Sequence, residues 1–436
     1  MIFGFGRRDD DDDDEDEEEF ESVIFQGAVN GKNPDLTENS RLVQAGLVPA
    51  KDMVSEALSR RAEMIRLEPK GKAAVVTYFI DGVAYPASKM PAQRGLAMTQ
   101  MLKLLAGLDI KQRSKPQKGG IKAEFDEKDF ELRIDTQPLQ GGAERLIVRA
   151  QDTSVSLEKP RDLGFSESLI EKIREVGSSK QGLLLAAGPP FSGVTTMAIA
   201  LLRSVDPYLY SIYCVADLGG RELSHVRMFE TKEGDNLETT LARARREDAD
   251  VIMVDALSDK EQARVVLEEC KNLSIVSEIP AKDAAEGIAR LVQLVGDPKL
   301  VAEQVKVVIS QKLIRVLCKK CRHAYRPNPK LLAKVGLPPE TSVLYRPPKP
   351  GDDEDEEEVD FCETCGGTGY FGRTGLVEAI EVNDEIKQII LKGGEPNGIR
   401  SAARAAKMQT FQSDGIRLVA EGRTSLEELQ RAFRSK

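Results

Sequence analysis

Short apolar runs alternate with helical patterns from about residue 160 to residue 310. A run of four to eight apolar residues between turn signals is typical of a strand that is buried on both faces. Strands that alternate with helices form a parallel sheet with helices on both sides. The pattern therefore predicts an α/β core over residues 160–310. Its predicted strands are Leu183–Ala187, Ser211–Val215, Val251–Val254 and Leu273–Val276.

A different pattern precedes this core and predicts a smaller α+β domain over residues 41–155. The β-branched run Ala73–Val83 contains Asp81-Gly82, a dipeptide that favours a hairpin turn. Lys159-Pro160 marks the predicted boundary with the core. The other predicted elements are two short helices, Ser40–Ala45 and Ala50–Arg61, a helix Gly95–Leu108, and strands Ile65–Pro69, Gly120–Phe125, Phe130–Thr136 and Arg145–Arg149. Residues 1–40 are predicted to be an acidic, disordered tail and linker.

A glycine-rich turn joins the first core strand to an apolar helix, Met197–Leu202. Backbone N–H groups and the positive end of a helix both face an anion at such a turn, which makes it a phosphate-binding loop. The turn fits the spacing G-x-x-x-x-G-K-[ST] except that Val194 stands in place of lysine. The candidate nucleotide-binding residues are Gly188, Ser192, Gly193, Val194, Thr195 and Thr196.

Four cysteines form two C-x-x-C pairs in the last third of the chain. Two such pairs supply the four thiolates of a tetrahedral zinc site, and a site filled by four cysteines is structural because no position remains for a substrate. A redox dithiol or a chance spacing is the alternative. The predicted ligands are Cys318, Cys321, Cys362 and Cys365, in a zinc insert over residues 311–375 that precedes a C-terminal helical region, 376–436.

Charge is distributed unevenly along the 436 residues, whose net charge is −10. Twelve acidic residues lie in Asp9–Glu21 and seven in Asp352–Glu358; without them the acidic residues fall from 72 to 53, against 62 basic residues. Like-charge runs of this kind stay solvated, or one of them folds back onto a basic groove. No apolar run approaches the roughly 20 residues of a transmembrane helix, and Met1–Arg8 is too short for a signal peptide. These features favour a cytoplasmic location.

From about residue 60 onward the chain resembles the type II secretion and type IV pilus assembly ATPases. The tetracysteine site is itself typical of that family. The resemblance implies a RecA-like hexameric motor that hydrolyses Mg-ATP beneath an inner-membrane platform, with no role for nucleic acid. The matching segments are Phe79–Val83, Leu105–Ile110, Pro116-Gln117, Glu131–Thr136, Asp250–Val254, Gly372–Gly375 and Met408–Glu428.

The departures from the family pattern fall on its active-site positions. Val194 replaces the loop lysine, Ala256 the glutamate that activates water, Pro280 the histidine of the histidine box, and Gly120 an arginine. The segment Ala216–Gly220 lacks both glutamates of the family's acidic box. Since losing one preorganised group costs on the order of 10²–10³ in rate, these losses together predict little hydrolysis.

Three hypotheses follow from these observations. The first is a catalytically inactive relative with a structural or regulatory role in a homo- or hetero-hexamer with an active paralogue, which retains weak nucleotide binding or none. The second is an active, divergent ATPase in which Asp255, at the end of a predicted strand, holds Mg²⁺ and a basic residue such as Arg203 or Lys282 replaces the lysine. The third is a polyanion- or envelope-binding adaptor whose basic body is gated by the acidic tail.

Overall fold

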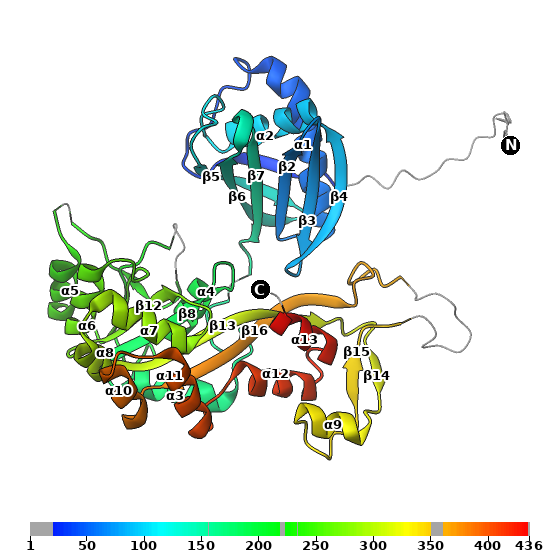
Figure 1. The fold of residues 1–436 in the computed structure, drawn as a ribbon. Coiled ribbons are helices and arrows are strands. Elements are labelled where there is room, and N and C mark those ends of the chain that lie inside the picture. The colour runs from blue at the N-terminus through cyan, green and yellow to red at the C-terminus, as the bar shows by residue number, and fades with distance from the viewer. Residues whose placement is uncertain (1–20, 156, 219–222, 233, 350–360, 435–436) are drawn as a thin grey trace. The chain divides into compact units, whose positions relative to one another are not determined.

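The computed structural model describes residues 21–155, 157–218, 223–232, 234–349 and 361–434 (Figure 1). The chain divides into two compact units, Met1–Val155 and Ser156–Lys436. Apart from Glu21, the acidic runs predicted to be solvated lie outside the described residues. None of the helices in the described ranges is both long enough and apolar enough to cross a membrane.

The first unit is a seven-stranded antiparallel sheet that packs against two helices (Figure 1). The helices are α1 (Ser40–Ser59) and α2 (Ala92–Leu105), and α2 contacts β2 and β3. Apolar side chains of the sheet and of both helices form one buried core. In spatial order the strands are β1 (Ile24–Ala28), β5 (Gln117–Phe125), β6 (Lys128–Pro138), β7 (Glu144–Asp152), β2 (Met64–Lys70), β3 (Ala73–Ile80) and β4 (Val83–Pro91).

Two predictions for this unit are wrong. The stretch 1–40, predicted to be tail and linker, contains β1, which pairs with β5. The two short helices predicted on either side of Pro49 are one helix of 20 residues, α1. Proline removes a helical hydrogen bond, but α1 is held against α2 so closely that a Cβ on Gly46 would lie 2.6 Å from the Ala97 carbonyl oxygen. Packing against α2 therefore outweighs the local cost of Pro49.

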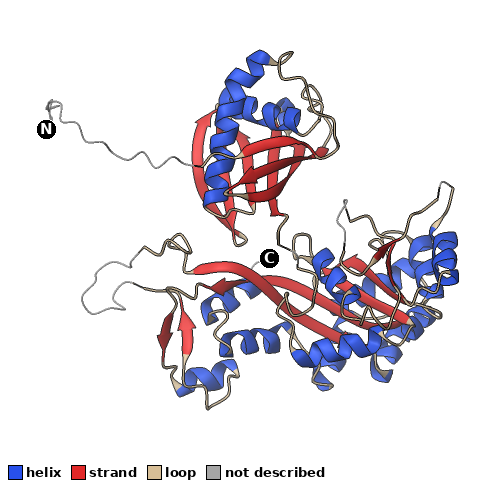
Figure 2. Cartoon of the chain, turned by 180° about the vertical axis from the view of Figure 1, so that it is seen from behind, coloured by secondary structure: helices blue, strands red, loops and turns tan. Residues whose placement is uncertain are grey.

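The second unit is built on a seven-stranded mixed sheet (Figure 2). Every neighbouring pair of strands is parallel except β13 and β16, which are antiparallel. This arrangement confirms the predicted α/β fold with a mostly parallel sheet. The spatial order is β10 (Arg227–Met228), β9 (Ile212–Cys214), β11 (Val251–Met253), β12 (Ser274–Pro280), β8 (Gly182–Gly188), β13 (Val305–Leu317) and β16 (Tyr370–Glu381).

Helices cover both faces of this sheet, as the alternating pattern predicts. One face packs against α3 (Glu167–Gly177) and α4 (Val194–Leu202). Residues of β8 alternate between the two cores: Leu184 and Ala186 face α4, whereas Leu183, Leu185 and Ala187 lie in the other core. The opposite face packs against α5 (Leu237–Arg246), α6 (Lys260–Glu269), α7 (Ala284–Val295), α8 (Pro298–Gln304), α10 (Asp384–Leu391) and α11 (Pro396–Ala405).

The cysteine-bearing insert lies between the two long strands β13 and β16 (Figure 1). It contains β14 (His323–Tyr325), α9 (Pro329–Val335) and β15 (Leu344–Arg346), and it shares a small core with α12 (Phe411–Ala420) and α13 (Leu426–Arg434). The predicted limits are therefore too wide. Residues at both ends of 311–375, and the first residues of 376–436, belong to strands of the central sheet.

Candidate nucleotide site and metal centre

The glycine-rich loop connects the end of β8 to the start of α4. Gly188 is the last residue of β8, and a Cβ there would lie 2.3 Å from Ser192 Oγ, so a larger residue would require Ser192 to move. Gly193 caps α4 with a φ of 78°, a left-handed conformation that glycine adopts readily. Strand, turn and helix are thus arranged as in a phosphate-binding loop.

The loop is fastened to the neighbouring strand β13 by Gln311. The Gln311 side-chain amide donates hydrogen bonds to the carbonyl oxygens of Ser192 (2.9 Å) and Gly193 (3.3 Å). Ser192 is buried, and in the described part of the chain its hydroxyl oxygen has no hydrogen-bond partner. The protein itself therefore holds the loop in its curved shape.

The position of the missing lysine is occupied by an apolar side chain at the first residue of α4. Val194 is half-buried and packs against the core formed with α3 and α4. A phosphate-binding lysine supplies a positive charge to the β- and γ-phosphates. Val194 supplies none, so the remaining attraction for phosphate comes from backbone N–H groups and the helix end.

The next residue, Thr195, is bound to a carboxylate of the protein. Its hydroxyl donates a hydrogen bond of 3.1 Å to Oε2 of Glu278, which lies in β12 opposite Ala186 of β8. Burial raises the pKa of Glu278, the hydrogen bond from Thr195 lowers it, and the nearby charge of Asp255 raises it further. A second neighbour, Thr196, is half-buried and has no described hydrogen bond through its side chain.

Asp255, the candidate Mg²⁺ ligand, lies just beyond β11 on the same side of the sheet. Its side chain is exposed, and Oδ1 accepts a hydrogen bond of 3.0 Å from the backbone N–H of Asp217. Its carbonyl oxygen accepts one of 2.7 Å from the Ser277 hydroxyl. Thr195 and Glu278 are in contact beside the loop, and Asp255 is near enough for its charge to raise the pKa of Glu278, so these three residues form an oxygen-rich cluster.

Sequence reasoning missed Glu278. The only signal is a carboxylate in the run Ser274–Ile279, whose other side chains are small or apolar and buried. The resemblance aligns this position with the threonine of the family's histidine box.

Two other positions named from sequence can be judged from their surroundings: Arg203 is too far along α4 to replace the lysine of the loop, and Gly120 has little room for an arginine. Arg203 follows the last residue of α4, nine residues or about 13 Å of helix from Val194. Its side chain is only 6% exposed and forms an ion pair with Glu158. Gly120 lies in β5 of the first unit, where a Cβ would come within 2.8 Å of Val29. An arginine at Gly120 would therefore require Val29 to move.

The four predicted cysteines converge in the structure. Their sulfur atoms all lie within 4.8 Å of one another, with 4.0 Å between Cys318 and Cys362 and 3.7 Å between Cys321 and Cys365. Four thiolates around one zinc ion at about 2.3 Å would lie roughly 3.8 Å apart. The donor set and its spacing therefore fit a tetrahedral metal ion.

Pairing of β13 with β16 closes the long gap between the two C-x-x-C pairs. Leu317, the last residue of β13, pairs with Tyr370, the first residue of β16, so Cys318 and Cys365 meet at the end of the same ladder. The backbone N–H of Cys365 lowers the pKa of the Cys362 thiol to about 7, which favours the thiolate that a metal needs.

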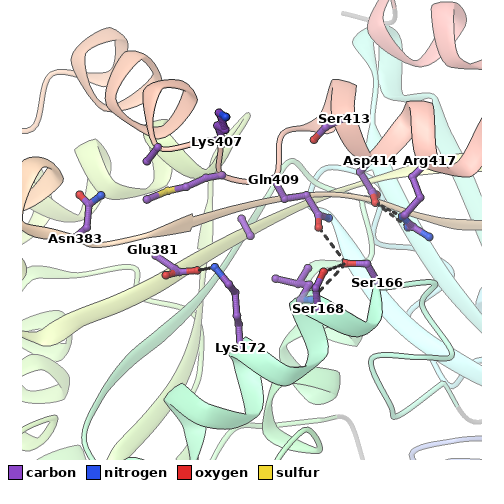
Figure 3. Close-up of a pocket in the computed structure, with 14 residues that line it drawn as sticks. Ser166, Ser168, Lys172, Glu381, Asn383, Lys407, Gln409, Ser413, Asp414 and Arg417 are labelled. Atoms are coloured by element: carbon purple, nitrogen blue, oxygen red, sulfur yellow. Dashed lines mark hydrogen bonds and ion pairs between the residues drawn. The ribbon is translucent and has the colours of Figure 1, made fainter. Parts of the chain in front are cut away.

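A separate cavity of about 510 Å³ lies between α3, the end of β16 and the start of α12 (Figure 3). Its cations are largely paired with carboxylates: Lys172 with Glu381, and Arg417 with Asp414. Ser166 donates a hydrogen bond of 3.2 Å to Gln409 across it. These contacts join α3 to the segment before α12, and they leave little free charge to recognise an ionic ligand.

Comparison with known proteins assigns the chain to a family. The family described as "Type II/IV secretion system protein" matches residues 42–431. The chain is 29% identical, over 387 residues, to the type IV pilus assembly ATPase PilB of Thermus thermophilus, and 28% identical, over 386 residues, to the type II secretion system protein E of Xanthomonas campestris. Each match covers 87% of this chain, but only 42% and 66%, respectively, of those proteins.

Solved structures agree with this assignment at the level of the fold. The ATPase DotB of Legionella pneumophila superposes with a TM-score of 0.53 at 17% identity, covering 87% of this chain and 94% of DotB. The pilus retraction motor PilT superposes with a TM-score of 0.50 at 17% identity, covering 88% of this chain and 96% of PilT. The sequence resemblance is thus confirmed: the chain belongs to the type II/IV secretion system protein family.

Proposed function

We propose that this chain is a structural or regulatory component of a type II secretion or type IV pilus assembly machine, and that its nucleotide site has lost hydrolysis. It would act in a homo- or hetero-hexamer with an active paralogue, on the cytoplasmic side of an inner-membrane platform. The assignment to such a machine is supported by the family to which the chain belongs and by relatives named as a type IV pilus assembly ATPase and a type II secretion system protein.

The observation that carries the loss of hydrolysis is the electrostatics of the loop. Phosphoryl transfer depends on positioning and on neutralising phosphate charge. Here the lysine position is Val194, and the carboxylate of Glu278 accepts the hydrogen bond of the Thr195 hydroxyl. A site with fewer positive and more negative charges stabilises neither the polyphosphate nor the transition state.

An active, divergent ATPase is the second candidate. The oxygen atoms of Thr195, Glu278 and Asp255 are the kind of ligands that Mg²⁺ prefers, and this cluster favours the second candidate. Arg203 does not replace the lysine in it, because Arg203 pairs with Glu158 at the far end of α4. An active enzyme predicts turnover that Asp255→Ala abolishes.

For the metal centre we propose structural zinc held by Cys318, Cys321, Cys362 and Cys365. Four cysteine ligands complete the tetrahedral shell and leave no position for a substrate. The ion would tie the ends of β13 and β16 to the insert between them, and the chemistry of the machine would take place elsewhere.

The decisive experiment measures Mg-ATP binding by isothermal titration calorimetry and phosphate release, with the full chain and with Val194→Lys. Val194→Met is the matched control, because methionine is about as long as lysine but carries no charge. The proposal predicts no turnover by the wild type. ATP hydrolysis by the wild type that Asp255→Ala abolishes would refute it and favour the divergent enzyme.

A further inference from the structure

We propose that Glu278 is a nucleotide-excluding residue: its carboxylate takes the place that the metal-bound end of Mg-ATP would need beside the loop. This inference rests on the proposed function and identifies a residue that enforces it. The loss of lysine at Val194 removes an attraction for phosphate. Glu278 adds a repulsion, so the site is closed to nucleotide by two independent changes.

The geometry places the carboxylate at the critical atom of the loop. Thr195 is the second residue of α4, and the hydroxyl at this position is the one through which phosphate-binding loops hold Mg²⁺. In this chain that hydroxyl is engaged with Oε2 of Glu278 at 3.1 Å. Glu278 reaches it from β12, the strand adjacent to β8, two residues before β12 ends opposite Gly188. The protein therefore supplies its own anion under the first turn of α4.

Among the residues that the structure describes, no lysine or arginine forms an ion pair with Glu278. Asp255 contributes a second negative charge nearby. A polyphosphate entering the loop would meet two carboxylates in a partly buried setting, where charges are screened less than in water. Burial strengthens the repulsion in the same way that it would strengthen a favourable pair.

The same carboxylates would attract a cation, so the opposite role for Glu278 is a ligand for the magnesium of Mg-ATP. The two roles predict opposite signs for one substitution. If Glu278 excludes nucleotide, Glu278→Thr raises the affinity for Mg-ATP. If Glu278 holds the metal, the same change lowers it. Threonine also occupies this position in the family pattern that the chain resembles, so it is a substitution that the strand accommodates.

The test compares four full-length proteins: wild type, Val194→Lys, Glu278→Thr and the double variant. Binding of a fluorescent ATP analogue is titrated in the presence of Mg²⁺. Because a lysine at position 194 would pair with Glu278, we expect Val194→Lys alone to gain little. We expect the double variant to bind at least tenfold more tightly than Val194→Lys. Adding Glu268→Thr to Val194→Lys is the matched control, since Glu268 is an exposed residue of α6 that pairs with Arg264.

Each outcome separates the inference from the function on which it rests. The role of Glu278 would be overturned by equal affinities of Val194→Lys and the double variant, by no binding to either, or by weaker binding after Glu278→Thr. None of these outcomes would contradict the proposal that the chain is a catalytically inactive component. Tight binding with turnover by the wild type would refute both. Glu278→Gln, which keeps the shape of the side chain and removes its charge, repeats the comparison in case the threonine variant folds poorly.

Discussion

The side-chain amide of Gln311 donates a hydrogen bond of 2.9 Å to the Ser192 carbonyl, joining β13 to a loop that lies 119 residues earlier in the chain. Gln311 is almost fully buried, and a Cβ on Gly193 would come within 2.9 Å of its amide nitrogen. The loop therefore keeps the shape of a phosphate cradle through contacts within the protein. This relationship explains how the fold of the site persists where its charges have changed.

Gln311→Ala is expected to loosen this loop. It leaves two carbonyl oxygens without their donor, which costs about 1–3 kcal/mol when such groups are buried. Hydrogen exchange of the amides in residues 189–196, read by mass spectrometry, should become faster. Gln181→Ala, at an exposed position before β8, should leave the exchange unchanged. Unchanged exchange in Gln311→Ala would mean that the loop is held by its own turn geometry.

Removing one cysteine of the tetracysteine cluster should release the metal. The purified chain is expected to carry one equivalent of zinc by mass spectrometric metal analysis, and Cys321→Ser to carry much less. Because metal affinity at such sites is also folding energy, the variant should melt earlier. Cys214→Ala is the control, since Cys214 is buried in β9 and lies outside the cluster. Equal metal content in both variants would contradict the assignment.

Glu428 lies between two arginines at the junction of α13 and β13. Its side chain is fully buried and accepts hydrogen bonds from Arg315 at 2.7 Å and Arg431 at 2.6 Å, while Arg315 lies 3.9 Å from the Tyr370 ring centre. Burial works to raise the pKa of Glu428, but the two arginines hold it below its ordinary value. The ionised form therefore stabilises the folded chain at neutral pH.

Glu428→Ala should lower the free energy of unfolding by about 3–5 kcal/mol, because breaking a buried ion pair leaves an unpaired charge. Urea denaturation measures this loss. The difference from wild type should be fully present above pH 4.5 and should shrink as the pH falls through the lowered pKa of Glu428, because the wild-type carboxylate is then neutralised as well. Glu421→Ala, at a half-exposed partner of Arg417, should cost under about 1 kcal/mol. Similar losses in both variants would contradict the role of burial.

The parallel core was predictable because its strands are near-continuous apolar runs, such as Leu183–Ala187, separated by helical patterns. The two halves of the cysteine cluster were predictable because C-x-x-C spacing brings two sulfur atoms together locally, whereas the meeting of the two halves depends on the pairing of β13 with β16. β1 was not predicted, because Ile24–Ala28 is short, only partly buried, and becomes a strand by pairing with β5 almost a hundred residues later.

The residues of the candidate site also differ in whether the sequence alone could identify them. Val194 could be identified from the loop spacing alone, since the motif fixes where lysine belongs. Glu278 and Gln311 could not be identified in this way, because no local sequence pattern indicates that β12 and β13 flank β8. Their side chains reach the loop only when the strand order is known, and the strand order depends on crossovers that join distant segments.

Glu278→Gln should stabilise the fold at neutral pH. Burial raises the pKa of Glu278 above its ordinary value of 4.5, so the folded chain binds a proton at a higher pH than the unfolded chain. The contribution of Glu278 to the free energy of unfolding is therefore fully present below pH 4.5 and is lost as the pH rises through the raised pKa. Glutamine still accepts the hydrogen bond from Thr195 and carries no charge, so it avoids this loss.

Thermal melts of both proteins from pH 5 to pH 8 measure the effect. The midpoint of Glu278→Gln should exceed that of wild type at pH 8, and each kcal/mol of difference corresponds to about 2–4 °C for a domain of roughly 200 residues. The difference in midpoint should narrow as the pH falls, because the wild-type carboxyl group then takes up a proton and loses its charge. The raised pKa values of Glu378 and Asp414 affect both proteins equally and cancel in the comparison.

The control is Glu268→Gln, on the exposed face of α6, whose melting midpoint should follow that of the wild type at each pH. A glutamine variant that melts below wild type at every pH would mean that the Glu278 charge is balanced in the folded state, and the exclusion of nucleotide by that charge would lose its basis.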